Sequence, residues 1–164
     1  MGGGTWIGPS RDDLSYLEEL ARQRIREGAQ PTRRNVFISF ATEDIKDVNM
    51  LRAQAKNENS EIEFNDWSLR EPFDSKRAEY IKSGIKNRIE HSSVTLVYVS
   101  DHTADSKWVS WEIEESVKLD KGVIAVYKGD SPPKKLPKAL LRIKAPLIQW
   151  TSEGIATAID QAAV

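Results

Sequence analysis

The residues best suited to chemistry lie in DSKWVSWEIEES, residues 105–116, which combines two tryptophans with four acidic side chains. Positions three and four apart share one face of a helix. On that spacing Glu112 falls on the row of Trp108, between an apolar row and a polar row, and Glu114 falls on the polar row. Glu112 is therefore predicted to be half-buried, where a carboxylate exerts a strong field on a nearby cation. On spacing alone, the simpler interpretation is a packed tryptophan beside a solvated acid.

The elements that must position this stretch alternate between strands and helices. Apolar runs predict five short strands, at 35–40, 61–66, 93–100, 123–127 and 145–150. Helical spacing predicts helices at 12–27, 44–57, 76–92, 106–122 and 151–164, the fourth ending at Gly122, and the proline-rich stretch after the fourth strand reads as loop with one helical turn. The alternation predicts an α/β fold, a flavodoxin-like five-stranded parallel sheet in the order 2-1-3-4-5 with helices on both faces. Residues 1–32 are predicted to form a tail and an amphipathic helix, and residues 33–164 the main domain.

Ligands in such sheets bind beyond the carboxyl ends of the strands, where the strand order reverses. Here that position falls on the loops ATED, WSLREPFDS and DHTAD, after strands one, two and three. No GxGxxG or GxxxxGK[ST] loop is present, which argues against dinucleotide-binding dehydrogenases and P-loop enzymes. A phosphoacceptor receiver domain would use Asp101, but Glu43 and Asp44 come late after the first strand and no lysine follows the fifth.

Composition limits the remaining classes. The 164 residues carry a net charge of −1, with 39% hydrophobic and 30% charged side chains, as a globular protein does. We expect no nucleic-acid partner and no membrane association. The absence of cysteine and the presence of only two histidines argue against disulfides, thiolate chemistry and a metal centre. No signal-peptide pattern opens the chain, and Trp6 stands where a myristoylation motif needs Ser or Thr, so we expect a cytoplasmic protein.

Two of these segments together resemble TIR domains. NVFISFATED is similar to their opening strand and acidic loop, and SKWVSWEI is similar to their S-x-W-x-x-x-E stretch, with Ser106, Trp108 and Glu112 on the three defined positions. KNENSEIEFNDWS and VIAVYKGD further resemble the bacterial TIR-like group that includes the NAD-cleaving subunit of Thoeris antiphage systems. The resemblance covers about residues 33–150.

The resemblance implies an enzyme that cleaves the bond between nicotinamide and ribose in NAD. Glu112 takes the place of the family's catalytic glutamate, and NAD is a substrate, so no further cofactor is expected. The developing positive charge on ribose suits a fixed anion in a cleft with little water. The resemblance implies that the other substrate-binding residues are Ser39, Phe40, Ala41, Asp66, Trp67, His102, Ser106 and Trp108. Phe40 is a candidate surface for stacking on nicotinamide, and Ser39 reads equally well as a strand end. Trp67 reads equally well as a residue that stacks on a base or one that packs under its loop, His102 reads more simply as a surface residue, and Trp111 is assigned to packing.

The same resemblance implies partners. We expect self-association through the TIR-domain loops, a phage-derived trigger, and a downstream effector that responds to an ADP-ribose-derived messenger, with a cyclic product preferred to linear ADP-ribose. The loop after the second strand lacks the pattern of animal receptor TIR domains, which argues against an adaptor role. The alternative is a TIR-like scaffold without turnover, which signals by assembly or by binding a nucleotide or partner. Under that interpretation the helix at 12–27 provides contacts between copies.

Overall fold

The computed structural model describes residues 11–29, 34–57, 62–65 and 72–163. The chain divides into two compact units, Met1–Arg33 and Arg34–Val164. The described part of the first unit is a single helix, α1 (Arg11–Ala29). In the described residues, no helix is both long enough and apolar enough to span a membrane.

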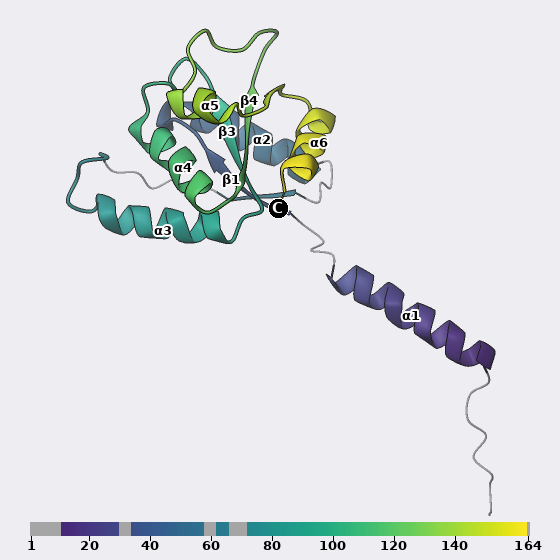
Figure 1. The fold of residues 1–164 in the computed structure, drawn as a ribbon. Coiled ribbons are helices and arrows are strands. Elements are labelled where there is room, and N and C mark those ends of the chain that lie inside the picture. Colours follow the sequence, from purple (N-terminus) through teal and green to yellow (C-terminus); the bar gives the residue numbers. More distant parts are fainter. Residues whose placement is uncertain (1–10, 30–33, 58–61, 66–71, 164) are drawn as a thin grey trace, which may run out of the picture. The chain divides into compact units, whose positions relative to one another are not determined.

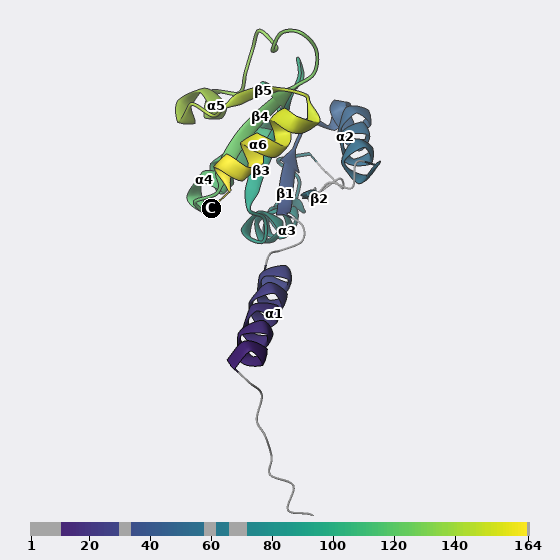
Figure 2. The same cartoon turned by 90° about the vertical axis from the view of Figure 1, so that its right-hand side faces the viewer.

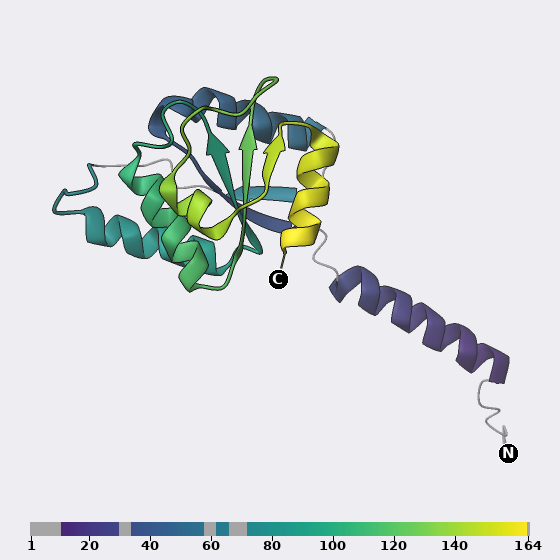
Figure 3. The same ribbon diagram turned by 45° about the horizontal axis from the view of Figure 1, so that its top comes forward.

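The second unit is built on a five-stranded parallel sheet. Its strands are β1 (Arg34–Ser39), β2 (Ile62–Asn65), β3 (Val94–Val99), β4 (Gly122–Tyr127) and β5 (Leu147–Gln149), in the spatial order β2-β1-β3-β4-β5. Figure 3 shows the arrows of β3, β4 and β5 pointing in the same direction. The register sets Val36 opposite Val94 and Thr95 opposite Val123, and every side chain of β3 is buried. The predicted flavodoxin-like order is confirmed.

Helices cover both faces of this sheet (Figure 1, Figure 2). On one face, α2 (Ile45–Asn57) and α6 (Ser152–Ala162) enclose a hydrophobic cluster with β1, β3 and β4. On the other face lie α3 (Ala78–Glu90), α4 (Lys107–Lys118) and α5 (Lys138–Ile143), over two further clusters. The sequence predicts one helical turn near α5, and the structure has a short helix there, preceded by Pro137. A 3-10 turn, Thr42–Asp44, joins β1 to α2.

The end of α4 differs from the prediction. The residue with left-handed backbone is Asp120, with φ of 55°, and Lys121 N–H donates to the Ser116 carbonyl at 2.9 Å. Gly122 is instead the first residue of β4, and a Cβ built on it would lie 2.1 Å from the carbonyl oxygen of Ala162. The prediction that Gly122 ends the helix is therefore wrong. Aspartate tolerates the left-handed conformation that closes the helix, and glycine is required where α6 approaches the strand.

Candidate functional site

Glu112 lies in the middle of α4, with its side chain directed at the end of β1. Its Oε1 accepts a hydrogen bond from the hydroxyl of Ser39 at 3.3 Å, and both side chains have an exposed fraction of 0%. Ser39 is the last residue of β1, so the pair forms at the carboxyl edge of the sheet, close to the reversal between β1 and β3. Burying a carboxyl group is unfavourable unless polar partners replace water, and the hydroxyl of Ser39 is one such partner.

Local sequence explains why α4 begins where it does. Ser106 caps the helix, because its hydroxyl oxygen accepts the Val109 N–H at 3.3 Å and satisfies one of the free donors of the first turn. Val109 and Ile113 then pack into the cluster with β3, β4 and α5. With those two side chains fixed on the sheet, the helical repeat turns Glu112 toward β1.

A second polar pair lies one turn further along α4. The hydroxyl of Ser116 donates to the backbone carbonyl of Glu112 at 2.7 Å. A serine hydroxyl has one proton, so the 2.7 Å contact between Ser116 and Thr95 uses the proton of Thr95. Both hydroxyl side chains are fully buried. The face of α4 that meets β1 and β3 is therefore held by two polar pairs, Ser39 with Glu112 and Thr95 with Ser116.

The loops after β1 and β3 are joined by a separate hydrogen-bond chain. The hydroxyl of Ser100 donates to Asp44 Oδ2 at 2.5 Å, and Ser100 N–H donates to Thr103 Oγ1 at 2.8 Å. Thr103 Oγ1 donates to the Tyr98 carbonyl at 3.2 Å, and the Thr103 carbonyl accepts the N–H of the α4 cap, Ser106, at 3.1 Å. The chain thus runs from the turn after β1 to the start of the helix that carries Glu112.

Asp44 is the charged member of this chain. Only 6% of the residue is exposed, and burial raises the pKa of its carboxyl above the ordinary value of 3.8. The hydrogen bond from Ser100 opposes this increase in pKa, as does the charge of His102. The carboxylate therefore holds the two loops together while burial disfavours its ionised form.

Aromatic side chains surround the first two turns of α4. Trp108, which is 7% exposed, meets Phe73 edge-on at 5.0 Å between ring centroids and Trp111 at 6.1 Å. Lys82 of α3 places its Nζ 4.2 Å from the centroid of Phe73. An open pocket of about 350 Å³ lies beside these rings, with Ser106, Phe73 and Trp111 among its lining residues. Trp111 thus lines a pocket as well as packing.

The predicted site residues have different positions in the structure. Ser39 and Glu112 are brought into contact, Ser106 is the N-cap of the helix that carries Glu112, and Trp108 lies in the first turn of that helix. Phe40 is 1% exposed and belongs to the cluster beneath α2 and α6, on the face of the sheet opposite Glu112. Ala41 is also buried, and His102 is exposed in the loop before α4. Asp66 and Trp67 lie outside the described residues.

Thr95, Ser116, Asp44, Ser100 and Thr103 were not predicted to belong to the site. All are short polar side chains. Thr95 lies within an apolar run and Ser100 ends it, whereas Asp44 and Thr103 lie in the loops after the first and third predicted strands and Ser116 lies in a predicted helix. Within the described ranges, no three His, Cys, Asp or Glu residues are grouped so that they could hold a metal ion.

Comparison with known proteins shows what the chain is similar to. The family described as "Thoeris protein ThsB, TIR-like domain" matches residues 37–132, more than half of the chain. A Cytobacillus dafuensis protein, whose name describes it as a cyclic ADP-D-ribose synthase, TIR2, is 27% identical over 120 residues. The match covers 72% of this chain and 31% of that protein, so the chain spans about a third of the relative's length.

Solved structures align with the chain only at low TM-scores. The TIR domains of the activated Roq1 resistosome align with a TM-score of 0.43 and 17% identity, over 78% of this chain and 69% of that one. A pilus assembly-related protein from Burkholderia pseudomallei aligns with a TM-score of 0.49 and 10% identity, over 82% and 95% of the two chains. Similarity this low carries no information about function.

Proposed function

Because this chain belongs to the family of Thoeris ThsB TIR-like domains, we propose that it cleaves NAD between nicotinamide and ribose. The product is free nicotinamide and an ADP-ribose-derived nucleotide. The observation that carries the proposal is the buried carboxylate of Glu112, held by Ser39 at the carboxyl edge of the sheet. Glu112 is the glutamate of the S-x-W-x-x-x-E pattern by which the sequence resembles TIR domains.

Cleavage of the bond between nicotinamide and ribose requires little from the protein beyond a well-placed anion. Nicotinamide is cationic in NAD, and when its bond to ribose breaks, the electron pair stays on nicotinamide, which leaves as a neutral molecule. Positive charge then develops on the ribose carbon and ring oxygen. A fixed carboxylate in a site with little water stabilises that charge more in the transition state than in the ground state. Because no leaving group has to be protonated, one carboxylate is sufficient.

The fate of the ADP-ribosyl group depends on which nucleophile reaches the ribose carbon. Attack by water gives linear ADP-ribose with loss of one water proton, and attack by an atom of the ADP-ribosyl group itself gives a cyclic nucleotide. The name of the Cytobacillus dafuensis relative supports the second outcome. We propose that the cyclic product is a messenger to an effector in antiphage defence, made after a phage-derived trigger.

One observation favours the alternative function, a scaffold that binds partners without turnover. Glu112 has no exposed surface, so a ribose cannot contact its carboxylate in this conformation. Turnover therefore requires a rearrangement that uncovers Glu112, such as one driven by self-association of the TIR unit. A scaffold requires no such step.

The test is NAD turnover by the protein concentrated until it assembles, with products separated by chromatography and identified by mass spectrometry. Glu112→Gln and Glu112→Ala should each abolish release of nicotinamide. Glu114→Gln is the matched control, because Glu114 lies two residues further on the same helix with its side chain exposed, and it should retain wild-type turnover. Equal loss in all three variants would show that the charge of α4, rather than Glu112, is responsible.

The same assay separates the two functions. Turnover that persists in both Glu112 variants excludes the assigned role. Intact NAD with the wild-type protein in the assembled state, together with binding of NAD by calorimetry, supports the scaffold.

A further inference from the structure

Helix α1 exposes apolar side chains along one face. Leu14 is 47% exposed and Leu17 is 51% exposed, and the three-residue spacing places them on the same side of the helix. Ala21, four residues after Leu17, continues the row and is also exposed. Most of the stability of an amphipathic helix in a protein comes from packing of its apolar face. We therefore expect another protein surface to cover the apolar face of α1.

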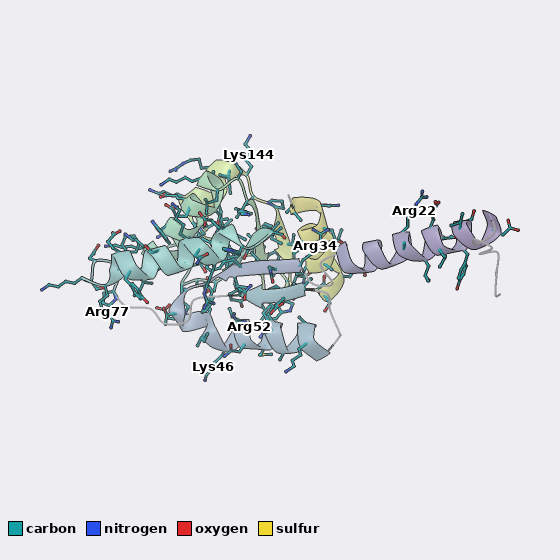
Figure 4. All side chains as sticks on the ribbon, turned by 90° about the horizontal axis from the view of Figure 1, so that it is seen from below. Arg22, Arg34, Lys46, Arg52, Arg77 and Lys144 are labelled. Atoms are coloured by element: carbon teal, nitrogen blue, oxygen red, sulfur yellow. The ribbon has the colours of Figure 1, made fainter. Side chains whose placement is uncertain are left out.

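Charge in α1 is divided between its two halves. The acidic side chains before Leu20 are Asp12, Asp13, Glu18 and Glu19. The basic side chains after Leu20 are Arg22, Arg24 and Arg26, of which Arg22 is labelled in Figure 4. The exceptions are one residue at each end, Arg11 and Glu27, and these also carry opposite charges. Two copies that run in opposite directions therefore bring the acidic half of each helix beside the basic half of the other.

We propose that α1 binds α1 of a second copy of this chain in antiparallel orientation. The register that sets Leu17 level with Ala21 of the other copy also brings Asp13 near the level of Arg24 and Glu18 near the level of Arg22. These four positions flank the apolar row on the helix, where charged side chains of paired helices meet. A parallel pair would instead place the acidic halves together and the basic halves together, and like charges at neighbouring positions are destabilising. An antiparallel pair is related by a two-fold axis, so each copy contributes the same surface and the assembly closes as a dimer.

The charges identify a second copy as the partner. An exposed apolar row alone would fit many surfaces, but exchange of acidic and basic halves matches the sequence of α1 itself. The interface is smaller than that of a permanent dimer, so association is weak, concentration-dependent and reduced by salt. Its effect is to raise the local concentration of the two TIR units that follow. Pairing of α1 does not require NAD cleavage, and self-association is measured without NAD.

The first experiment uses the full chain and two charge-reversed variants. One variant replaces Arg22, Arg24 and Arg26 with Glu, and the other replaces Asp12, Asp13, Glu18 and Glu19 with Lys. At low salt, light scattering should show the wild-type mass rising with concentration toward twice the 18.5 kDa of one chain. Each variant alone should remain a monomer, and an equimolar mixture should recover the dimer. Recovery in the mixture also shows that the variants fold.

The second experiment determines the relative orientation of the two helices. The chain has no cysteine of its own, so only the introduced cysteines can form disulfides. Leu14→Cys and Arg24→Cys proteins, whose cysteines lie on the proposed interface and are level in this register, are mixed and oxidised. An antiparallel pair crosslinks the two different variants to each other, whereas a parallel pair crosslinks each variant to itself. Predominant self-crosslinking overturns the orientation. A wild-type protein that stays monomeric at every concentration overturns the proposal and indicates that the face of α1 is covered within one chain.

Discussion

Replacement of Gly122 by alanine tests the packing at the amino end of β4. An added Cβ would lie 2.1 Å from the carbonyl oxygen of Ala162, and real contacts of this kind essentially never fall under 3.0 Å. The last turn of α6 must therefore move by about 1 Å, although Ile155, Ala158 and Ile159 anchor the helix in the core. Overpacking of this kind costs about 1–3 kcal/mol.

An opposing effect reduces the net cost. The backbone of Gly122 does not have positive φ, so alanine gains about 0.4–1 kcal/mol by restricting the unfolded chain. We expect Gly122→Ala to lower the free energy of unfolding by about 1–2 kcal/mol, or Tm by roughly 3–8 °C. Thermal unfolding followed by circular dichroism measures this change. Well below Tm, NAD turnover should be unchanged, because the candidate site lies at the opposite end of the strands.

A truncation provides the control for this mechanism. Removal of residues 162–164 takes away the carbonyl that the new Cβ meets, and it has its own cost because Ala162 and Ala163 pack on the core. A double-mutant cycle separates the two contributions. The penalty of Gly122→Ala should nearly vanish in the truncated protein. A Gly122→Ala protein as stable as wild type, or an equal penalty with and without residues 162–164, would refute the steric explanation.

Two further predictions concern the polar contacts near the site. Because burial raises the pKa of Asp44, the contribution of this carboxyl group to stability is fully present below the ordinary value of 3.8 and is lost as pH rises through the raised pKa. Asp44→Asn keeps an acceptor for Ser100 but has no carboxyl group to ionise. The stability of this variant relative to wild type should therefore increase between acidic and neutral pH. Urea unfolding of both proteins at an acidic and at a neutral pH measures this difference in stability. A difference that does not change with pH contradicts the prediction. Thr95→Val and Ser116→Ala should each cost about 1–2 kcal/mol, and the double variant should cost less than their sum by about 0.5–1.5 kcal/mol; additive costs would show that the two hydroxyls act separately.

The strand order of the sheet could be predicted from the apolar runs of the sequence and their alternation with helical segments. β3 is a continuous apolar run because it is buried on both faces, and alternation with helices leaves few ways to order five strands. The helical repeat also selects Glu112 from the three glutamates of α4. Glu112 is more buried than the predicted half-burial. Ser39 of β1 is a polar partner for its carboxyl group, which makes complete burial of the side chain less unfavourable.

The polar contacts between elements could not be predicted in the same way. Thr95 meets Ser116 and Asp44 meets Ser100 only because the register of β1, β3 and α4 brings them together. A single serine or threonine in an apolar run has no periodicity that reveals its partner. The role of Gly122 depends on where α6 ends, which no local pattern near Gly122 encodes.

The complete enclosure of Glu112 has a kinetic consequence if the residue is catalytic. The basal rate of a resting protein is then proportional to the small population in which the carboxylate is accessible, and the apparent affinity for NAD falls by the same fraction. Any contact that favours the accessible population by about 1.4 kcal/mol raises the rate tenfold. For the proposed NAD cleavage, a closed site of this kind would keep turnover low at rest and leave a wide range for activation, because occupancy of a rare conformation, not the chemical step, sets the output.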